Sequence, residues 1–418
     1  MAGPSATRLV VFSDDWGRHP SSAQHLIGHL LERYPTVWVN TIGTRPPGYS
    51  RDDIRKIGVK LGQWTTPWFR RGSQLSRGFA DATPGAGSRA NLTVITPRMW
   101  PGFRRSWQRR LNRRLIGGAV NRALGPRGSD GARRVVVTTL PISADLIGKI
   151  DADGWVYYCV DDLSVWPGVD GQVMRDMEQI LVQRAQRLIV ASETLQERLA
   201  GLGRESTLLT HGIEVDFWRT GRPRSFAGST PGVGDGANPG TLPEWWGALP
   251  RPIILFWGLI DRRLDSAWVE ALCDRKTGSG GSVVLVGPQQ AADPHLRDLA
   301  GLVMPGAVAY AALPALAAAA DALVMPYADL PVTRAMQPLK FKEYLATGKP
   351  VIVRDLPATR PWADAADVVA EAGAFVRCVR QRVQTGVPAE QLQARKRLAG
   401  ESWEQKARQF EMVMMGAV

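Results

Sequence analysis

Short apolar runs alternate with helix-like segments along most of this chain. An apolar run of about four to eight residues is typical of a buried strand, and apolar residues recurring every three or four positions are typical of a helix. Strand-like runs occur at 9–12, 36–40, 92–95, 135–139, 155–160, 188–191, 207–210, 253–257, 282–286, 322–325 and 351–353. Helix-like segments include 106–124 and 143–150, and helices are expected from about 362 to the end. This alternation favours parallel sheets covered on both faces and therefore predicts the α/β fold class.

The alternation breaks between residues 221 and 250. Gly, Pro and Ser dominate there and no periodicity persists, which is typical of a linker. A chain of 418 residues is also long for a single core. We therefore expect an N-terminal Rossmann-like domain at 1–220, a linker at 221–250 and a C-terminal Rossmann-like domain at 251–401. Their parallel sheets would face each other across a cleft, and such clefts are common ligand sites.

Residues 333–352 read as a loop, a helix and a buried strand. Pro338 suits the first turn of a helix, where its missing N–H would have no partner anyway, and Gly348 supplies a left-handed stop. The free N–H groups and dipole of such a helix start attract phosphate, and Lys340 and Lys342 stand in that turn. Glu343 lies about 7 Å along the helix axis from Pro338, which is about the offset from a diphosphate to the ribose of one nucleotide. An amphipathic helix with solvated lysines is the alternative interpretation.

A second loop of the C-terminal half has matching features. Gly258 follows the predicted strand 253–257 and allows close approach of the backbone to a ligand. Arg262 or Arg263 could reach a phosphate from the same loop. This loop and residues 333–352 would then clamp one diphosphate. A surface turn with salt-bridged arginines is the alternative.

Polar residues follow three predicted strands of the N-terminal half, namely Asp14-Asp15, Asp161-Asp162 and His211. In parallel sheets, ligands bind beyond the carboxyl ends of the strands. These acids are therefore candidates to orient sugar hydroxyls or to act as a base, and His19 near the first strand end could also meet substrate. Capping and turn formation explain the same acids without any ligand.

No metal or cofactor site is predicted. His25 and His29 could share a helix face, but no third ligand accompanies them. The three cysteines are scattered and odd in number, which indicates a reducing compartment. No apolar run approaches the roughly 20 residues of a membrane span. The N-terminus leads straight into the predicted strand 9–12, so we expect no signal peptide and a cytoplasmic protein.

The net charge of +13 is unevenly distributed. Seven arginines and no acid lie between positions 98 and 114, interleaved with large apolar residues, and 64–77 is a second such segment. Basic residues mixed with Trp and Phe suit an anionic membrane surface. We expect peripheral attachment at the inner face of the membrane through Trp100, Arg104, Arg105 and Trp107. A solvated helix face and a nucleic-acid surface are the alternatives, and no specific nucleic acid is predicted.

Together these features resemble the GT-B fold glycosyltransferases of the large nucleotide-sugar group related to retaining family-four enzymes. The resemblance covers nearly the whole chain and is carried by 14–25, 188–192, 208–217, 256–263, 325–352 and 401–403. Segments 256–263 and 325–352 are the most specific. The resemblance implies two Rossmann-like domains and a final helix, at about 402–418, that crosses back to the first domain.

The resemblance also implies roles for individual residues. The donor nucleotide would be held by Glu343 at the ribose, with Gly258, Thr333, Gln337, Pro338 and Leu339 nearby. Catalytic roles at the diphosphate would be carried by Lys340, Arg262 and Arg263, and Asp161, a candidate base from its position at a strand end, completes the predicted catalytic set. The acceptor side would consist of Asp14, Asp15, Arg18, His19 and His211.

One position departs from the family pattern. The family places an acid eight positions before its ribose-binding Glu, and this chain has Ala335 there. Thr333, Arg334 or Gln337 are the candidates to replace the missing contact with the donor sugar.

The implied activity is transfer of a sugar from a UDP- or GDP-linked donor to a hydroxyl of a glycan, a lipid-linked sugar or a cell-envelope polysaccharide. Cations and a helix N-terminus can stabilise a departing diphosphate, so we expect a metal-independent reaction without a cofactor, with retention of configuration. The alternatives are a catalytically silent GT-B-like binding protein, a sugar-nucleotide epimerase and a nucleic-acid binder.

Overall fold

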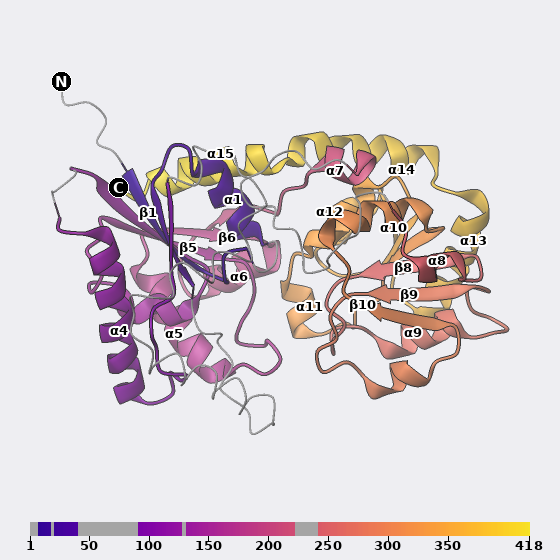
Figure 1. Ribbon diagram of the computed structural model, residues 1–418, viewed down its shortest axis with the longest axis horizontal. Coiled ribbons are helices and arrows are strands. Elements are labelled where there is room, and N and C mark those ends of the chain that lie inside the picture. Colours follow the sequence, from indigo (N-terminus) through magenta and orange to yellow (C-terminus); the bar gives the residue numbers. More distant parts are fainter. Residues whose placement is uncertain (1–6, 18–20, 41–90, 128–130, 222–240) are drawn as a thin grey trace.

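The computed structural model describes residues 7–17, 21–40, 91–127, 131–221 and 241–418. The predictions for Arg18, His19 and the basic segment 64–77 lie outside these ranges. Two α/β units lie side by side, one formed by the first half of the chain and one by the second (Figure 1).

The N-terminal domain is built on a seven-stranded sheet of order β3-β2-β1-β4-β5-β6-β7, in which all pairings are parallel. Its strands are β1 (Thr7–Ser13), β2 (Thr36–Asn40), β3 (Leu92–Ile95), β4 (Arg133–Thr138), β5 (Gly154–Cys159), β6 (Arg187–Val190) and β7 (Thr207–Leu208). Side chains alternate along β1, so that Leu9 and Val11 enter one core and Val10 and Phe12 enter the other. Both faces of this sheet are therefore buried.

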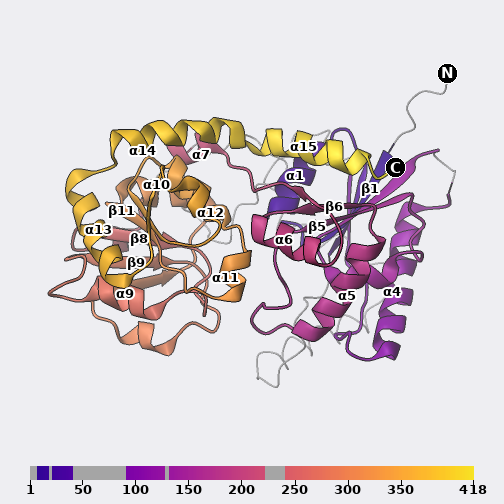
Figure 2. The same cartoon turned by 180° about the vertical axis from the view of Figure 1, so that it is seen from behind.

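Helices from distant parts of the sequence cover these two faces. Helix α1 (Ser22–Leu30) and the final helix α15 (Trp403–Met415) pack together over one face, where Trp403, Ala407 and Phe410 join the core of Leu9 and Val11. Helices α4 (Ser106–Leu124), α5 (Gly171–Arg184) and α6 (Glu193–Gly201) cover the other (Figure 2). The C-terminal end of the chain thus completes the N-terminal domain.

The C-terminal domain contains a parallel six-stranded sheet of order β10-β9-β8-β11-β12-β13. Its strands are β8 (Ile253–Trp257), β9 (Ser282–Val286), β10 (Leu302–Gly306), β11 (Ala322–Met325), β12 (Val351–Arg354) and β13 (Asp367–Val369). Its α-helices are α9 (Ser266–Cys273), α10 (Leu313–Ala319), α11 (Pro331–Ala335), α12 (Leu339–Ala346), α13 (Ala372–Thr385) and α14 (Ala389–Ala394). The expected pair of parallel α/β sheets is confirmed.

The chain passes between the domains twice, near Ile213 (the first crossing) and near Glu401 (the second crossing), and these two segments run beside each other. The Ile213 N–H donates to the Glu401 carbonyl at 2.9 Å, and Ile213 forms a parallel bridge with Ser402. Helix α7 (Val215–Thr220) follows at once and packs against α10 and α12 in the C-terminal domain. The first crossing therefore precedes α7, several residues before the predicted boundary at 220.

Several local predictions were wrong. Residues 143–150 are not an α-helix, because only a 3₁₀ segment at Pro141–Leu146 forms there. Strand β13 interrupts the region after 362 that was predicted to be helical, and β10 was not predicted. Helix α11 lies partly in the predicted loop 333–337. The predicted linker contains α8 (Glu244–Gly247), whose Trp246 is buried in the C-terminal core.

Candidate functional site

Helix α12 begins directly after Pro338 and ends before Gly348, whose φ of +76° is the left-handed stop expected from the sequence. Its first turn places Lys340 at the carboxyl-end side of the C-terminal sheet, where the loop after β8 also lies. A Cβ atom added to Gly258 would lie 2.2 Å from the Lys340 Nζ atom. The two segments predicted to form one phosphate site are therefore in direct contact.

The Lys340 ammonium is surrounded by aromatic groups. Its Nζ donates to the Tyr327 hydroxyl at 2.5 Å and lies 5.1 Å from the centroid of the Phe256 ring and 5.2 Å from that of Tyr327. Within the described part of the chain, its hydrogen bond goes to this hydroxyl and no ion pair joins it to a carboxylate. A cation held by rings and a hydroxyl keeps its charge available for an anionic ligand.

Glu343, one turn along α12 from Lys340, is held by two aromatic donors. The Trp257 indole N–H donates to Oε2 at 3.1 Å, and the Tyr310 hydroxyl donates to Oε1 at 3.0 Å. Burial of the carboxyl raises its pKa, and these hydrogen bonds and Lys340 oppose that rise. Neither ring was singled out by the sequence analysis. Trp257 directly precedes Gly258, whereas nothing in the local sequence marks Tyr310.

The two arginines of the β8 loop have different environments. Arg263 is buried, forms 3.0 Å bonds with both carboxylate oxygens of Asp261, and lies 4.8 Å over the Trp166 ring of the N-terminal domain. Arg262 is exposed. Arg263 is thus an interdomain residue whose charge is already shared with Asp261, and only Arg262 carries its charge into solvent.

Asp161 follows β5 on the N-terminal side of this region. Burial raises the pKa of its carboxyl to about 7, with a further rise from Asp162, while the Arg263 guanidinium opposes it. The neighbouring Asp162 is fixed differently, since it accepts from the Ser164 hydroxyl at 2.6 Å and pairs with Arg198 at 3.4 Å. A carboxyl whose pKa is raised to about 7, as for Asp161, suits a base that works near neutral pH.

His211 is buried between the domains. Burial and the charge of Lys342 lower its pKa to about 3, and its ring forms a hydrogen bond with the backbone of Gln337. The predicted acceptor residue His211 and the predicted donor residue Gln337 are therefore neighbours. The adjacent Leu339 packs against the N-terminal core.

The side chains of two predicted ligand residues, Thr333 and Asp14, form hydrogen bonds with residues close to them in the sequence. The Thr333 side chain is fully buried, and its hydroxyl donates to the Ala328 carbonyl and accepts from the Leu330 N–H at 2.9 Å. The Thr333 side chain therefore helps to cap the start of α11, reaching back from the third helical position to the Leu330 N–H. The Asp14 carboxylate accepts hydrogen bonds of 2.8–3.0 Å from Ser13, Ser21 and Gln24, which fits the capping alternative, while Asp15 is half-buried.

Ala335 contacts the N-terminal domain. Its side chain joins the core that contains Val10 and Phe12, and its carbonyl accepts from the Ser192 hydroxyl at 2.6 Å. Helices α11 and α6 face each other at this point in both views (Figures 1 and 2). The position of the missing acid is therefore packed against protein, and Arg334, one proposed substitute, is exposed and paired with Asp329.

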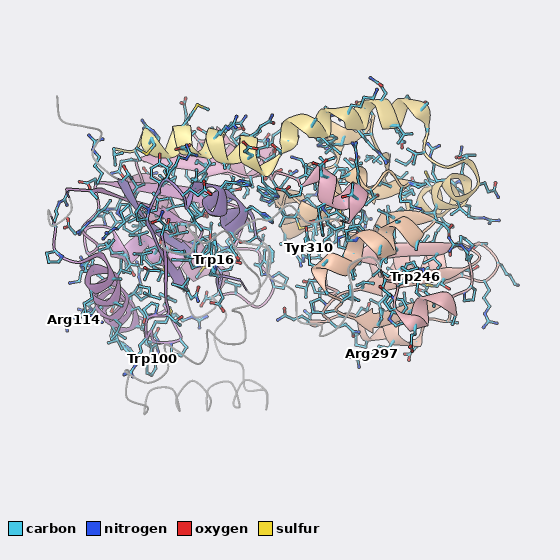
Figure 3. The ribbon with its side chains drawn as sticks, turned by 45° about the horizontal axis from the view of Figure 1, so that its top comes forward. Trp16, Trp100, Arg114, Trp246, Arg297 and Tyr310 are labelled. Atoms are coloured by element: carbon cyan, nitrogen blue, oxygen red, sulfur yellow. The ribbon has the colours of Figure 1, made fainter. Side chains whose placement is uncertain are left out.

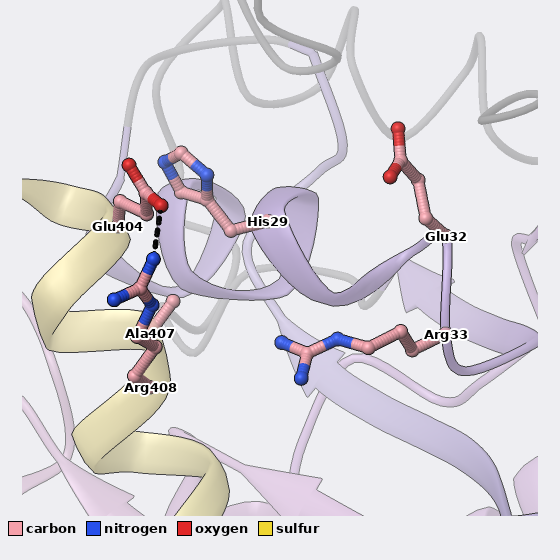
Figure 4. A pocket seen from close by; sticks show the side chains of 6 residues that line it. All are labelled: His29, Glu32, Arg33, Glu404, Ala407 and Arg408. Atoms are coloured by element: carbon pink, nitrogen blue, oxygen red, sulfur yellow. Dashed lines mark hydrogen bonds and ion pairs between the residues drawn. The ribbon is translucent and has the colours of Figure 1, made fainter.

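Two surface pockets lie away from these residues. One lies between α1 and α15 and is lined by His29, Glu32, Arg33, Glu404, Ala407 and Arg408 (Figure 4). The other is lined by residues 186–188 and 203–207. Neither borders Lys340 or Glu343. Within the described ranges, no three His, Cys, Asp or Glu side chains gather as a metal site requires.

The outer face of α4 is basic. Arg104 pairs with Asp170 at 2.7 Å and Arg109 with Asp145 at 2.6 Å. The exposed residues here include Arg104, Arg105, Trp107, Arg110, Arg113 and Arg114. Trp100 packs edge-on against Trp107 with ring centroids 5.2 Å apart, and Trp100 and Arg114 lie at the edge of the molecule farthest from the C-terminal domain (Figure 3). Across the described part of the chain, no helix is both long and apolar enough to cross a bilayer.

No protein-family model and no curated protein sequence matches the chain. Among solved structures, Anabaena HepE in complex with UDP-glucose matches with a TM-score of 0.63 and 10% identity over 98% of this chain and 99% of that chain. Sucrose-phosphate synthase from Thermosynechococcus elongatus matches with a TM-score of 0.63 and 14% identity over 98% of both chains. An E. coli structure described as trehalose-6-phosphate bound with UDP-2-fluoro glucose matches with a TM-score of 0.62 and 11% identity over 99% of this chain and 100% of that chain. These likenesses show the fold, and the predicted GT-B fold is confirmed.

Proposed function

We propose that this protein is a glycosyltransferase that moves a sugar from a nucleotide-sugar donor to an acceptor hydroxyl. The observation that carries the proposal is the contact between Lys340 and Gly258, with Glu343 one turn further along the same helix. A cation, a glycine-lined backbone and a helix N-terminus suit a diphosphate, and a carboxylate suits a ribose. Proteins of this fold bound to UDP and UDP-glucose support the choice of a nucleotide sugar, with UDP the first donor to test and GDP the second.

In the proposed reaction, the bond from the anomeric carbon to the diphosphate breaks and its electron pair leaves with the diphosphate. Lys340 and the N-terminus of α12 stabilise the charge that develops there, with Arg262 as a second cation. The new bond forms between the anomeric carbon and the acceptor oxygen, whose proton passes to Asp161. Retention, independence from metals and a glycan or lipid-linked acceptor remain part of the proposal.

Replacing Lys340 with Ala is expected to weaken UDP binding about ten- to a hundredfold, because a hydrogen bond to a charged group contributes about 1.5–3 kcal/mol. Glu343→Gln should weaken it as well. Isothermal titration calorimetry on the full chain measures both. Lys276→Ala removes an exposed lysine of the same domain and should leave the affinity unchanged. Wild-type affinity in both site variants would exclude this nucleotide site.

A catalytically silent GT-B-like binding protein is the second candidate, and the packing of Ala335 against the N-terminal domain favours it, because no acid is available there for the donor sugar. Incubation with a panel of UDP- and GDP-sugars separates the candidates. Transfer to an acceptor supports the transferase, an epimerised donor supports an epimerase, and nucleotide binding without any product supports the silent protein.

The α4 surface fits a cytoplasmic protein that attaches peripherally to an anionic membrane carrying the acceptor. Each basic residue near such a surface contributes about 1 kcal/mol. Replacing Arg113 and Arg114 with Gln should therefore weaken binding to phosphatidylglycerol-containing vesicles about thirtyfold. Vesicle sedimentation measures this, with Arg275→Gln and Arg297→Gln on the other domain as the control for equal charge loss. Equal losses in both pairs would contradict a specific surface, and duplex DNA tests the nucleic-acid alternative.

A further inference from the structure

Each carboxylate oxygen of Glu343 accepts one hydrogen bond from an aromatic side chain. Trp257, at the end of β8, donates its indole N–H to Oε2, and Tyr310, from the 3₁₀ segment Tyr310–Ala312, donates its hydroxyl to Oε1. These donors come from segments more than 50 positions apart in the sequence, and each takes a different oxygen. The carboxylate is therefore fixed in one rotation about its terminal bond.

Helix α7 locks both donor rings in place. Phe217 stacks on Tyr310 with centroids 5.2 Å apart and an interplanar angle of 12°, and Trp218 stacks on Trp257 at 5.1 Å and 9°. Phe217, Trp218 and Trp257 are all buried. Two consecutive aromatic residues thus hold the two donors, so neither donor ring can turn away from Glu343 without disturbing a packed cluster.

A carboxylate has about four acceptor positions, and it donates no hydrogen bond when ionised. With one position on each oxygen taken by a ring donor, each oxygen keeps another for a ligand. Two adjacent acceptor positions match two adjacent hydroxyls, as a ribose presents. A site built in this way discriminates against a sugar that lacks one of those hydroxyls, because a buried acceptor is then left without a partner.

We propose that Tyr310 and Trp257 are positioning residues that set Glu343 to accept both ribose hydroxyls of the donor nucleotide and thereby select ribonucleotides over deoxyribonucleotides. This inference rests on the proposed function, since it concerns the same nucleotide site. Neither ring touches the reacting atoms, and both act through the orientation of Glu343.

The test compares the dissociation constants of UDP and 2′-deoxy-UDP on each variant, with GDP and 2′-deoxy-GDP as a second pair. The ratio of the two constants is informative, because both ligands are measured on the same sample and the folded fraction cancels. Wild-type protein should prefer the ribonucleotide. Tyr310→Phe, which removes only the hydroxyl, and Trp257→Phe should each reduce the ratio about threefold to tenfold, the effect of one hydrogen bond. Glu343→Gln should reduce it at least as much.

Tyr34→Phe is the matched control, because the Tyr34 hydroxyl donates to the Glu411 carboxylate at 2.6 Å in the N-terminal domain. It loses the same kind of bond and should keep the wild-type ratio. A wild-type ratio in Tyr310→Phe and Trp257→Phe, together with a reduced ratio in Glu343→Gln, overturns the positioning role and leaves the proposed function intact. A wild-type protein that binds none of the four nucleotides overturns the proposed function, and the inference with it.

Discussion

Replacing Asp161 with Asn is expected to lower the rate of sugar transfer by a factor of about 10² to 10⁴, the range that general-base catalysis contributes. Nucleotide affinity should change little, because Asp161 follows β5 of the N-terminal domain, whereas Lys340 and Glu343 belong to α12 of the C-terminal domain. The rate of the wild-type protein should rise with pH through a midpoint near 7, since the carboxyl must lose its proton to act as a base and its pKa is raised to about 7. Single-turnover transfer measured from pH 5 to 9 checks both expectations.

Stability gives an independent readout of the same group. A carboxyl whose pKa in the folded state exceeds its usual value of 3.8 binds its proton more tightly when folded, so the folded state loses stability as pH rises toward 7. The amide that replaces this carboxyl in the variant does not titrate. Asp161→Asn should therefore match the wild-type free energy of unfolding near pH 4 and exceed it above pH 7.

The control for both readouts is Asp176→Asn, an exposed acid of the same domain. It should change neither the rate profile nor the pH dependence of stability. Transfer by Asp161→Asn at the wild-type rate would mean that another group, such as the leaving phosphate, accepts the proton. A stability difference that does not depend on pH would contradict the raised pKa.

The sequence predicted the interior of both sheets well, because central parallel strands are buried on both faces and appear as continuous apolar runs. It also predicted β3 and β7, the edge strands of the N-terminal sheet, but it missed both edge strands of the C-terminal sheet. In β10 the apolar run ends after three residues, at Pro305 and Gly306, and β13 is three half-buried residues long with only two apolar ones. These edge strands form because their neighbours β9 and β12 offer unpaired backbone groups, and that information is tertiary.

Some contacts of the candidate site could likewise be predicted from the sequence, and others could not. The contact between Lys340 and Gly258 could be predicted, because both follow strands of one parallel sheet and such loops meet at one edge. The hydrogen bond from Tyr310 to Glu343 could not be predicted, because Tyr310 lies 33 positions away in a short 3₁₀ segment that no sequence pattern marks. The capping role of Thr333 could not be predicted either, because a hydroxyl in a loop serves a cap or a ligand equally well and only the structure shows its backbone partners.

Lys342 shows why residue type alone misleads. It is a lysine of the same helix turn as Lys340, yet it points to the opposite side and is buried at 2% exposure. Its Nζ donates to the Glu401 carboxylate at 2.6 Å and to the His211 carbonyl at 2.5 Å. Lys406 approaches the same carboxylate at 2.8 Å. One carboxylate at the second chain crossing thus joins α12, α15 and the first crossing.

Glu401→Gln is expected to destabilise the protein by about 3–5 kcal/mol, because it leaves two buried ammonium groups facing each other without the carboxylate that compensates them. Burial already lowers the pKa of Lys342 to about 8, and Glu401 opposes that fall. Without Glu401 the pKa should fall further. A lysine whose pKa is lower in the folded state gains stability as pH rises through that value, so the deficit of the variant should shrink toward pH 9.

Chemical denaturation of the full chain at pH 7 and pH 9 measures the free energy of unfolding for this comparison. Glu404→Gln is the matched control, since Glu404 lies three residues further along and its pair with Arg408 is exposed, so that its loss should cost no more than about 1 kcal/mol. Lys342→Met combined with Glu401→Gln should recover part of the loss, because the double variant then buries one ammonium group, that of Lys406, in place of two that repel each other. Equal losses for Glu401→Gln and Glu404→Gln would show that the crossing gains nothing from its buried carboxylate, and the two domains would then be held by apolar contacts such as that of Ala335.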